Sequence, residues 1–145
     1  MNTKSTDELV HEIKVATDIE DYLQKNKDQL LRGSLSQHLQ MLLLKKGLRK
    51  ADVMRGSLLG RAYLYQIFSG EKIPARDKLI ALAFGLRLSD EETQKMLKLS
   101  GNRELYARDG RDALLLYALQ RGMTIMTVNE LLLDHHFAVL DTAKD

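Results

Sequence analysis

The chain has 145 residues, with 22 basic and 20 acidic side chains for a net charge of +2, and it contains no cysteine. This length suits one compact domain, or a small domain with helical appendages, rather than several large domains. Without cysteine, a disulfide framework and a thiolate metal site are both excluded.

The composition favours an all-α protein. One proline and nine glycines are present, and no segment alternates apolar and polar residues over the length of a strand. The first residues lack the apolar run of a secretory signal. Uncharged apolar runs such as 79–86 are far shorter than the roughly 20 residues that cross a bilayer. We therefore expect a soluble, cytoplasmic protein without membrane contact.

The near-neutral total charge hides a basic centre. Residues 36–88 hold ten Lys and Arg against three acids, a net charge of +7, whereas 1–35 carry −2 and 89–145 carry −3. A basic stretch of this kind is the first feature expected of a nucleic-acid-binding protein. Solvated helix faces are charged as well, so the charge alone does not establish the function.

Residues 1–33 are predicted to form an N-terminal arm of two amphipathic helices. Leu9, Ile13 and Ala16 recur at helical spacing in the first. Asp18 can cap the second, and the acids that follow it suit a first turn, where the helix dipole favours negative charge. The arm is too polar to fold alone.

Residues 34–100 are predicted to form five helices. Ser34 and Gln37 have the spacing of a capping box, which opens the first of them. The others are expected at 50–56, at 60–69, at 74–85 with Pro74 at the start, and at 89–101 with a Ser89–Glu92 capping box.

The helix expected at 60–69 has one apolar side. On a helical wheel, Tyr63, Leu64 and Ile67 share the inward side. The outward side holds Arg61, Ala62, Tyr65, Gln66 and Ser69, and it includes no acid.

Residues 101–145 are predicted to be a C-terminal helical extension. Asp109 can cap a helix over 111–121, which is apolar nearly all round and is therefore expected to be buried on more than one side. Thr124 can cap a last helix. From about Val139 the chain is expected to fray.

Segment 47–74 follows the spacing of a DNA-binding motif. Its marker residues are Gly47-Leu48, Val53 on the second helix, Leu59 in the turn, Arg61, the inward pair Leu64 and Ile67, then Gly70 and Pro74. This pattern resembles the helix-turn-helix domain of the phage repressor and Cro family, also called the Xre family. Gly60, Lys50 and Phe68 depart from the residues usual there. The resemblance implies a lambda-repressor-like five-helix DNA-binding domain, with helical extensions at both ends.

By this resemblance, the third helix of the domain would lie in the major groove and the protein would act as a transcriptional regulator. Arg61, Ala62 and Gln66 would read base edges, with Tyr65 as a flanking contact. A guanidinium can meet guanine O6 and N7 together, and a carboxamide can meet adenine N6 and N7. The phosphate contacts implied are Lys50, Tyr63, Lys72, Arg76 and Lys78, which would fix the register without reading sequence.

Other interpretations stay open. Each of these side chains could belong to a solvated helix face, and Tyr63 could lie at the edge of the core. The same fold could serve as a protein-interaction module, an antitoxin or adaptor that uses the tyrosines and Phe68 against a partner. We expect no enzyme, cofactor or metal, because active-site motifs are missing and His135-His136 fits an exposed helix end.

The resemblance implies double-stranded DNA as the partner, and members of this family commonly bind it as dimers. If the chain dimerises with two-fold symmetry, the half-sites should be about 10 base pairs apart, or a multiple of that. The helices near 111–137 could supply the pairing surface, through Leu114, Leu115, Tyr117, Leu131, Leu132 and Phe137. Equally, these residues could only close the core of the monomer.

Overall fold

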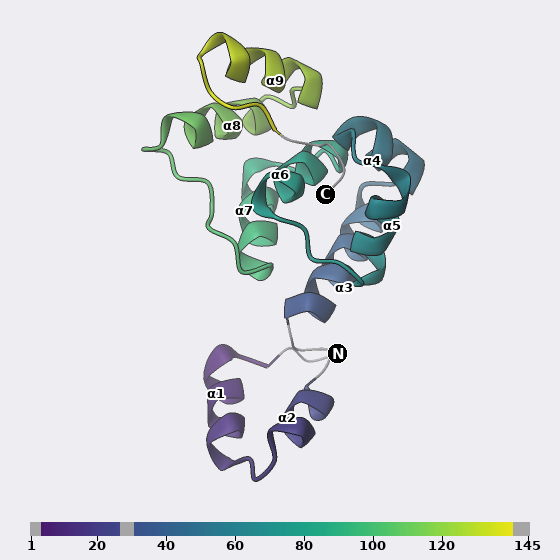
Figure 1. Cartoon of the computed structure of the whole chain (residues 1–145), viewed down its shortest axis with the longest axis vertical. Coiled ribbons are helices and arrows are strands. Elements are labelled where there is room, and N and C mark those ends of the chain that lie inside the picture. Colours follow the sequence, from purple (N-terminus) through teal and green to yellow (C-terminus); the bar gives the residue numbers. More distant parts are fainter. Residues whose placement is uncertain (1–3, 27–30, 141–145) are drawn as a thin grey trace.

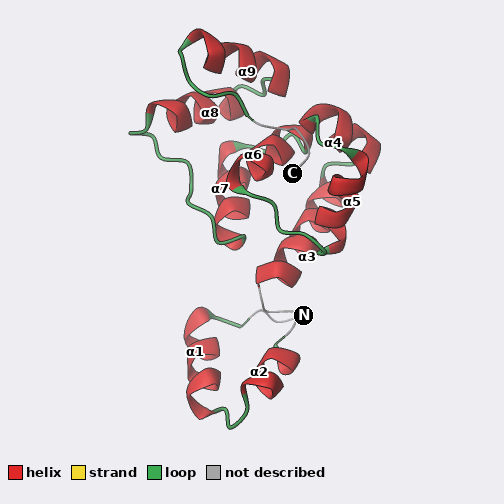
Figure 2. Cartoon of the chain, viewed as in Figure 1, coloured by secondary structure: helices red, strands yellow, loops and turns green. Residues whose placement is uncertain are grey.

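The computed structural model describes residues 4–26 and 31–140, and within these ranges the chain is entirely helical, with no strand (Figures 1 and 2). This confirms the predicted all-α class. The helices of the described ranges are α1 (Thr6–Val15), α2 (Ile19–Lys25), α3 (Leu31–Lys45), α4 (Lys50–Ser57), α5 (Arg61–Ser69), α6 (Arg76–Gly85), α7 (Asp90–Leu99), α8 (Gly110–Gln120) and α9 (Ile125–Asp134). None of these helices is long and apolar enough to span a membrane.

α1 and α2 form a hairpin in which the two helices run in opposite directions (Figure 1). Asp18 caps α2 as predicted, and Ser5 caps α1. The buried Asn26 accepts a hydrogen bond from Lys4 Nζ at 2.7 Å and donates one to Glu12 at 2.8 Å. A polar network around one buried amide therefore holds the two short helices together.

The start of α3 differs from the prediction. The helix begins at Leu31, so Ser34 lies inside it and is not its N-cap. A Ser-x-x-Gln pattern marks a helix start only where the preceding residues leave the helical conformation, and here 31–33 continue the helix. The predicted domain boundary at residue 34 therefore falls within α3.

α6 is the central helix of the body formed by α3 to α9. Residues 78–85 are all buried, and α4, α7 and α9 pack against the helix. Its N-cap is Ala75, so Pro74 precedes the helix instead of starting it. Because nearly every face of α6 is covered, its sequence lacks the polar stripe of a surface helix.

α4 crosses α6 at close range because two glycines meet there. A Cβ added to Gly85 would lie 2.6 Å from the carbonyl oxygen of Val53 and 2.9 Å from Cβ of Ser57, and a Cβ added to Gly56 would lie 3.0 Å from the Cα of Gly85. No larger residue fits without a shift of backbone. This crossing fixes α4, and through α4 it fixes the helix that follows.

α7 begins with the predicted capping box, and the box also ties α7 to α3. Ser89 accepts from Glu92 N and Glu92 accepts from Ser89 N. Lys45, the last residue of α3, and Lys46, which follows it, form ion pairs with Glu92 at 3.3 and 2.7 Å. Burial alone would raise the pKa of Glu92, but the hydrogen bonds from Lys46, Ser89 and Lys45 outweigh it and hold the pKa at about 2.

Glu92→Gln is expected to remove about 2–3 kcal/mol of stability at pH 7. A carboxyl whose pKa is lower in the folded state stabilises the fold above its unfolded pKa, near 4.5, and this contribution disappears as the pH falls towards 2. Urea unfolding followed by circular dichroism at pH 7, 4 and 2.5 measures it. The difference in free energy of unfolding between wild type and Glu92→Gln should shrink as the pH is lowered. The variant Glu91→Gln, at an exposed neighbouring residue, should have the free energy of unfolding of wild type at all three pH values. A gap that stays constant with pH would contradict the role of Glu92.

α8 and α9 share the core of the body. Leu115 and Leu132 are buried in the same cluster as α6, and Leu114 and Phe137 are partly buried against it. The capping predictions are confirmed, since Asp109 caps α8 and Thr124 caps α9. Most of the apolar surface predicted for dimer pairing thus closes the monomer's own core.

The chain does not fray at Val139. The next residue, Leu140, is 2% exposed, and its backbone N donates to Asn129 Oδ1 at 2.9 Å. For Val139 and Leu140 the expectation of fraying was wrong, because it rested on position near the chain end, whereas burial and hydrogen bonding of the backbone decide such cases. Residues 141–145, to which the expectation also applied, lie outside the described residues.

Candidate nucleic-acid interface

A short turn, residues 58–60, joins α4 to α5. Leu58 ends α4 in the left-handed region with φ 62°, a conformation that glycine usually provides. The Ser57 hydroxyl accepts a hydrogen bond from Leu59 N at 3.3 Å, and the Leu59 side chain is buried. Leu59 therefore anchors the turn, and Gly60 follows as the N-cap of α5.

The inward side of α5 is as predicted. Tyr63, Leu64 and Ile67 are buried, together with Phe68. The opposite face carries Arg61, Ala62 and Ser69, which are exposed, Gln66, which is partly exposed, and Tyr65, which is 44% exposed. The four predicted base-reading residues therefore lie together on one accessible face, which has no acid in its sequence.

Two cations lie against the ring of Tyr65. Lys50 Nζ is 4.7 Å and Arg61 Cζ 5.6 Å from the ring centroid. A cation over an exposed aromatic ring gains about 0.5–1 kcal/mol, which is enough to bias the rotamers of long side chains. Lys50, at the start of α4, thereby joins the face presented by α5, although it lies 15 residues away from Tyr65 in sequence.

The second tyrosine has a different environment. The ring of Tyr63 has Lys72 and Lys78 over it, with Nζ to centroid distances of 5.5 and 5.2 Å. Tyr63 and Lys78 are each only 8% exposed, whereas Lys72 is exposed. Of these three predicted phosphate contacts, Lys72 alone is exposed, and Tyr63 fits the alternative interpretation of a core-edge residue.

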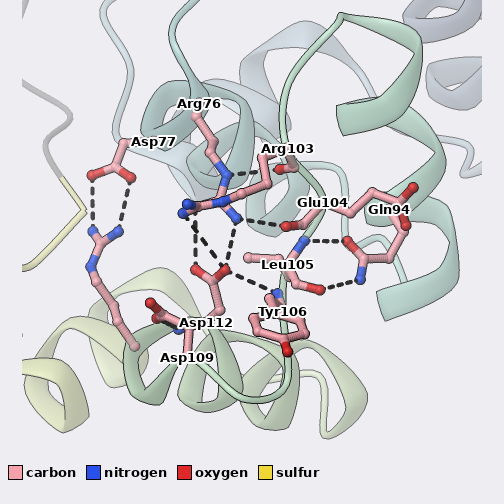
Figure 3. A network of polar contacts seen from close by, with 10 residues as sticks. Arg76, Asp77, Gln94, Arg103, Glu104, Leu105, Tyr106, Asp109 and Asp112 are labelled. Carbon is pink, nitrogen blue, oxygen red and sulfur yellow. Dashed lines mark hydrogen bonds and ion pairs between the residues drawn. The ribbon is translucent and has the colours of Figure 1, made fainter.

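Arg76 is committed to a contact within the chain. Its guanidinium donates to Asp112 from NH1 at 3.2 Å and from NH2 at 2.9 Å, and to the carbonyls of Arg103 and Glu104 at 2.8 and 3.0 Å (Figure 3). With its donors directed at these acceptors, Arg76 is removed from the predicted phosphate set. The sequence could not reveal this, because Asp112 is 36 residues away.

A second arginine–aspartate pair accompanies the first. Arg111 of α8 donates to Asp77 of α6 at 3.0 and 2.9 Å. The first turn of each helix thus holds an Arg-Asp dipeptide, 76–77 in α6 and 111–112 in α8, and each arginine binds the aspartate of the other helix. Burial alone would raise the pKa of Asp112, but the hydrogen bonds from Arg76 and from the Tyr106 N–H outweigh it and leave the pKa lowered. These pairs fix α8 on the body.

Sequence reasoning did not single out two exposed cations at α4. Arg49 precedes α4 and Arg55 lies near its end, and both flank Asp52. The signal was present, since both residues were counted in the basic centre. They were not singled out because the family pattern draws attention to the third helix of the domain.

Phe68 cannot serve the alternative function as proposed. Its side chain is buried, and its carbonyl oxygen accepts hydrogen bonds from Ser36 at 2.6 Å and Gln40 at 3.0 Å. A protein-interaction face on α5 would therefore rely on Tyr65 and would lack Phe68.

The adjacent histidines end α9. His135 is the C-cap and His136 follows with φ 64°, both exposed. Among the residues that the structure describes, no group of three or more histidine and acidic side chains is placed to hold a metal ion.

Comparison with family models, with curated proteins and with solved structures finds no match to this chain.

Proposed function

We propose that this chain binds double-stranded DNA through α5 and acts as a sequence-specific transcriptional regulator. The observation that carries the proposal is the exposed, acid-free face of α5, on which Arg61, Ala62, Tyr65 and Gln66 lie beside Lys50. Negatively charged phosphates flank the major groove, so a helix that enters it must present such a face.

The arrangement around α5 supports the proposal. α3 to α7 are five helices in the order expected of a lambda-repressor-like domain, with two short ones, α4 and α5, joined by a three-residue turn. In helix-turn-helix proteins the second helix of that pair reads the groove with its N-terminal residues while the first crosses the backbone. Arg61 and Ala62 open α5, where base contacts are expected.

Arg61 and Gln66 are the proposed specificity residues. A bidentate contact from Arg61 to guanine, or from Gln66 to adenine, contributes roughly 1–3 kcal/mol of discrimination each. The ring of Tyr65 orients Arg61 and lies between the two readers in sequence.

Phosphate contacts are assigned to Lys50 and Lys72, with Arg49 and Arg55 as additional cations. Lys78, Tyr63 and Arg76 are set aside because of their burial or their partners. A half-site that neutralises about four phosphates should show a log–log salt slope of about −3 to −4.

Selection of bound duplexes from a random pool, followed by titration of variants, tests the proposal. Arg61→Ala should cost roughly 1–3 kcal/mol on the selected sequence and relax the preference at one position, while Lys72→Ala should weaken all sequences alike and lower the salt slope by about 1. Arg121→Ala, exposed at the end of α8, is the matched control. If Arg61→Ala and Lys72→Ala both bound like wild type, α5 would not be the reading helix. Binding of a protein partner with little salt dependence, and no selected DNA, would instead favour an interaction module centred on Tyr65.

A further inference from the structure

The N-terminal hairpin leaves large apolar side chains uncovered. Val10 and Ile13 on α1, and Ile19 and Leu23 on α2, are each between 44% and 58% exposed. Isolated apolar residues on a surface are normal, but a contiguous apolar patch of a few hundred Å² on a small unit indicates an interaction site.

These four side chains lie on one face of the hairpin. In α1, the partly buried Glu12, which accepts a hydrogen bond from Asn26, marks the side that faces α2, and Val10 and Ile13 are rotated by about 100° from that side. In α2, Ile19 and Leu23 are rotated in the same sense from the buried Tyr22. The two helices are antiparallel (Figure 1). Apolar pairs that are rotated in the same sense from the contact between the helices therefore lie on the same face of the hairpin. Val15, also exposed, lies on the opposite face.

We propose that a second copy of the same hairpin covers this face, so that two chains pair through a four-helix bundle. Two-helix units commonly bury their apolar faces in such bundles. The proposal rests on the proposed function in one respect, because a DNA reader of this size gains affinity by engaging two half-sites. It replaces the pairing surface expected at 111–137, which is mostly buried in the core of the monomer.

Charges at the rim of the face fit a two-fold pairing. Lys14 lies at the outer edge of the face on α1 and Glu20 at the outer edge on α2, both near the loop that joins the helices. In the described residues neither side chain forms an ion pair. A two-fold axis parallel to the helices sets α1 of one copy against α2 of the other with both loops at the same end, so that Lys14 faces Glu20 of the second copy twice.

The size of the patch sets the expected strength. Each face presents four large apolar side chains, whereas a standard stable interface engages about 20–30 residues a side, so we expect a dissociation constant in the micromolar range. In this geometry both chains leave the bundle at the end opposite the loops, which allows two bodies to reach neighbouring half-sites on one duplex.

Sedimentation equilibrium of the full chain at roughly 100 µM tests the pairing. Wild type should be a dimer, and Ile13→Glu should raise the dissociation constant tenfold or more, because a carboxylate would enter an apolar interface. Val15→Glu, on the opposite face, should remain dimeric. Circular dichroism and thermal unfolding of the body should be unchanged in both. A monomeric wild type, or a dimer that persists in Ile13→Glu, would overturn the proposal.

A charge exchange tests the orientation. Lys14→Glu and Glu20→Lys should each weaken the dimer, and the double variant should restore it. Failure of the double variant to recover would exclude the two-fold arrangement described here. Binding to a selected single half-site, measured on Ile13→Glu, keeps the two proposals apart. If Ile13→Glu is monomeric but still binds the half-site, the substitution affects only the hairpin interface. If the wild type dimerises but binds no selected DNA, only the proposed function is contradicted.

Discussion

Arg76→Ala should lower the free energy of unfolding by about 3–5 kcal/mol, because it leaves the carboxylate of Asp112 buried without its main partner. The side chain of Asp112 is 2% exposed, and Arg76 holds both of its oxygens. The change also strips the carbonyls of Arg103 and Glu104 of a donor. Urea unfolding should show a lower midpoint with an unchanged slope.

Arg103→Ala is the matched control. Arg103 approaches the same carboxylate at 4.0 Å but its side chain is 70% exposed, so its removal should cost less than about 1 kcal/mol. Adding Asp112→Asn to Arg76→Ala should recover part of the loss, since a neutral amide no longer needs a cation. Equal losses for the two arginine variants would contradict the role assigned to the buried pair.

Gly85→Ala should destabilise the protein by about 2–3 kcal/mol, near the upper part of the range for overpacking. The added methyl group would clash with α4 at the Val53 carbonyl and at Ser57. Backbone atoms cannot relieve such a clash by changing rotamer, as a flexible side chain can. The strain should displace α4 and weaken DNA binding as well. Thermal unfolding and duplex titration on the same samples measure both effects.

Gly60→Ala is the appropriate comparison for this variant. Gly60 has φ −66° and nothing within 4 Å of an added Cβ, so we expect a change below about 1 kcal/mol. If the two alanine variants were equally stable, the close approach of α4 to α6 would not limit the packing.

Much of the fold could be predicted because local signals agree with the packing. The Ser89–Glu92 box and the caps Asp109 and Thr124 set helix starts that the structure confirms. A helical wheel predicts the inward side of α5 correctly because one face of the helix is buried and the other is not. The prediction that Ser34 caps a helix was wrong because a capping pattern also occurs inside helices.

The candidate site could be predicted only in part. Which residues of α5 face outward is a local property, and the four predicted readers do so. Which cations near α5 already have partners depends on contacts across the fold, as Arg76 with Asp112 illustrates. For the same reason, the sequence alone does not decide whether the C-terminal helices close the core or pair two chains. The structure places Leu115 and Leu132 in the core.

The contrast between α6 and α5 has an evolutionary consequence. A change anywhere in residues 78–85 is felt by several neighbouring helices at once, whereas Arg61, Ala62, Tyr65 and Gln66 can be exchanged without disturbing the interior. If α5 reads DNA as proposed, duplicated copies of this gene can diverge in the sequences they bind while inheriting the same scaffold. Engineers who graft new residues onto those four positions would exploit the same tolerance.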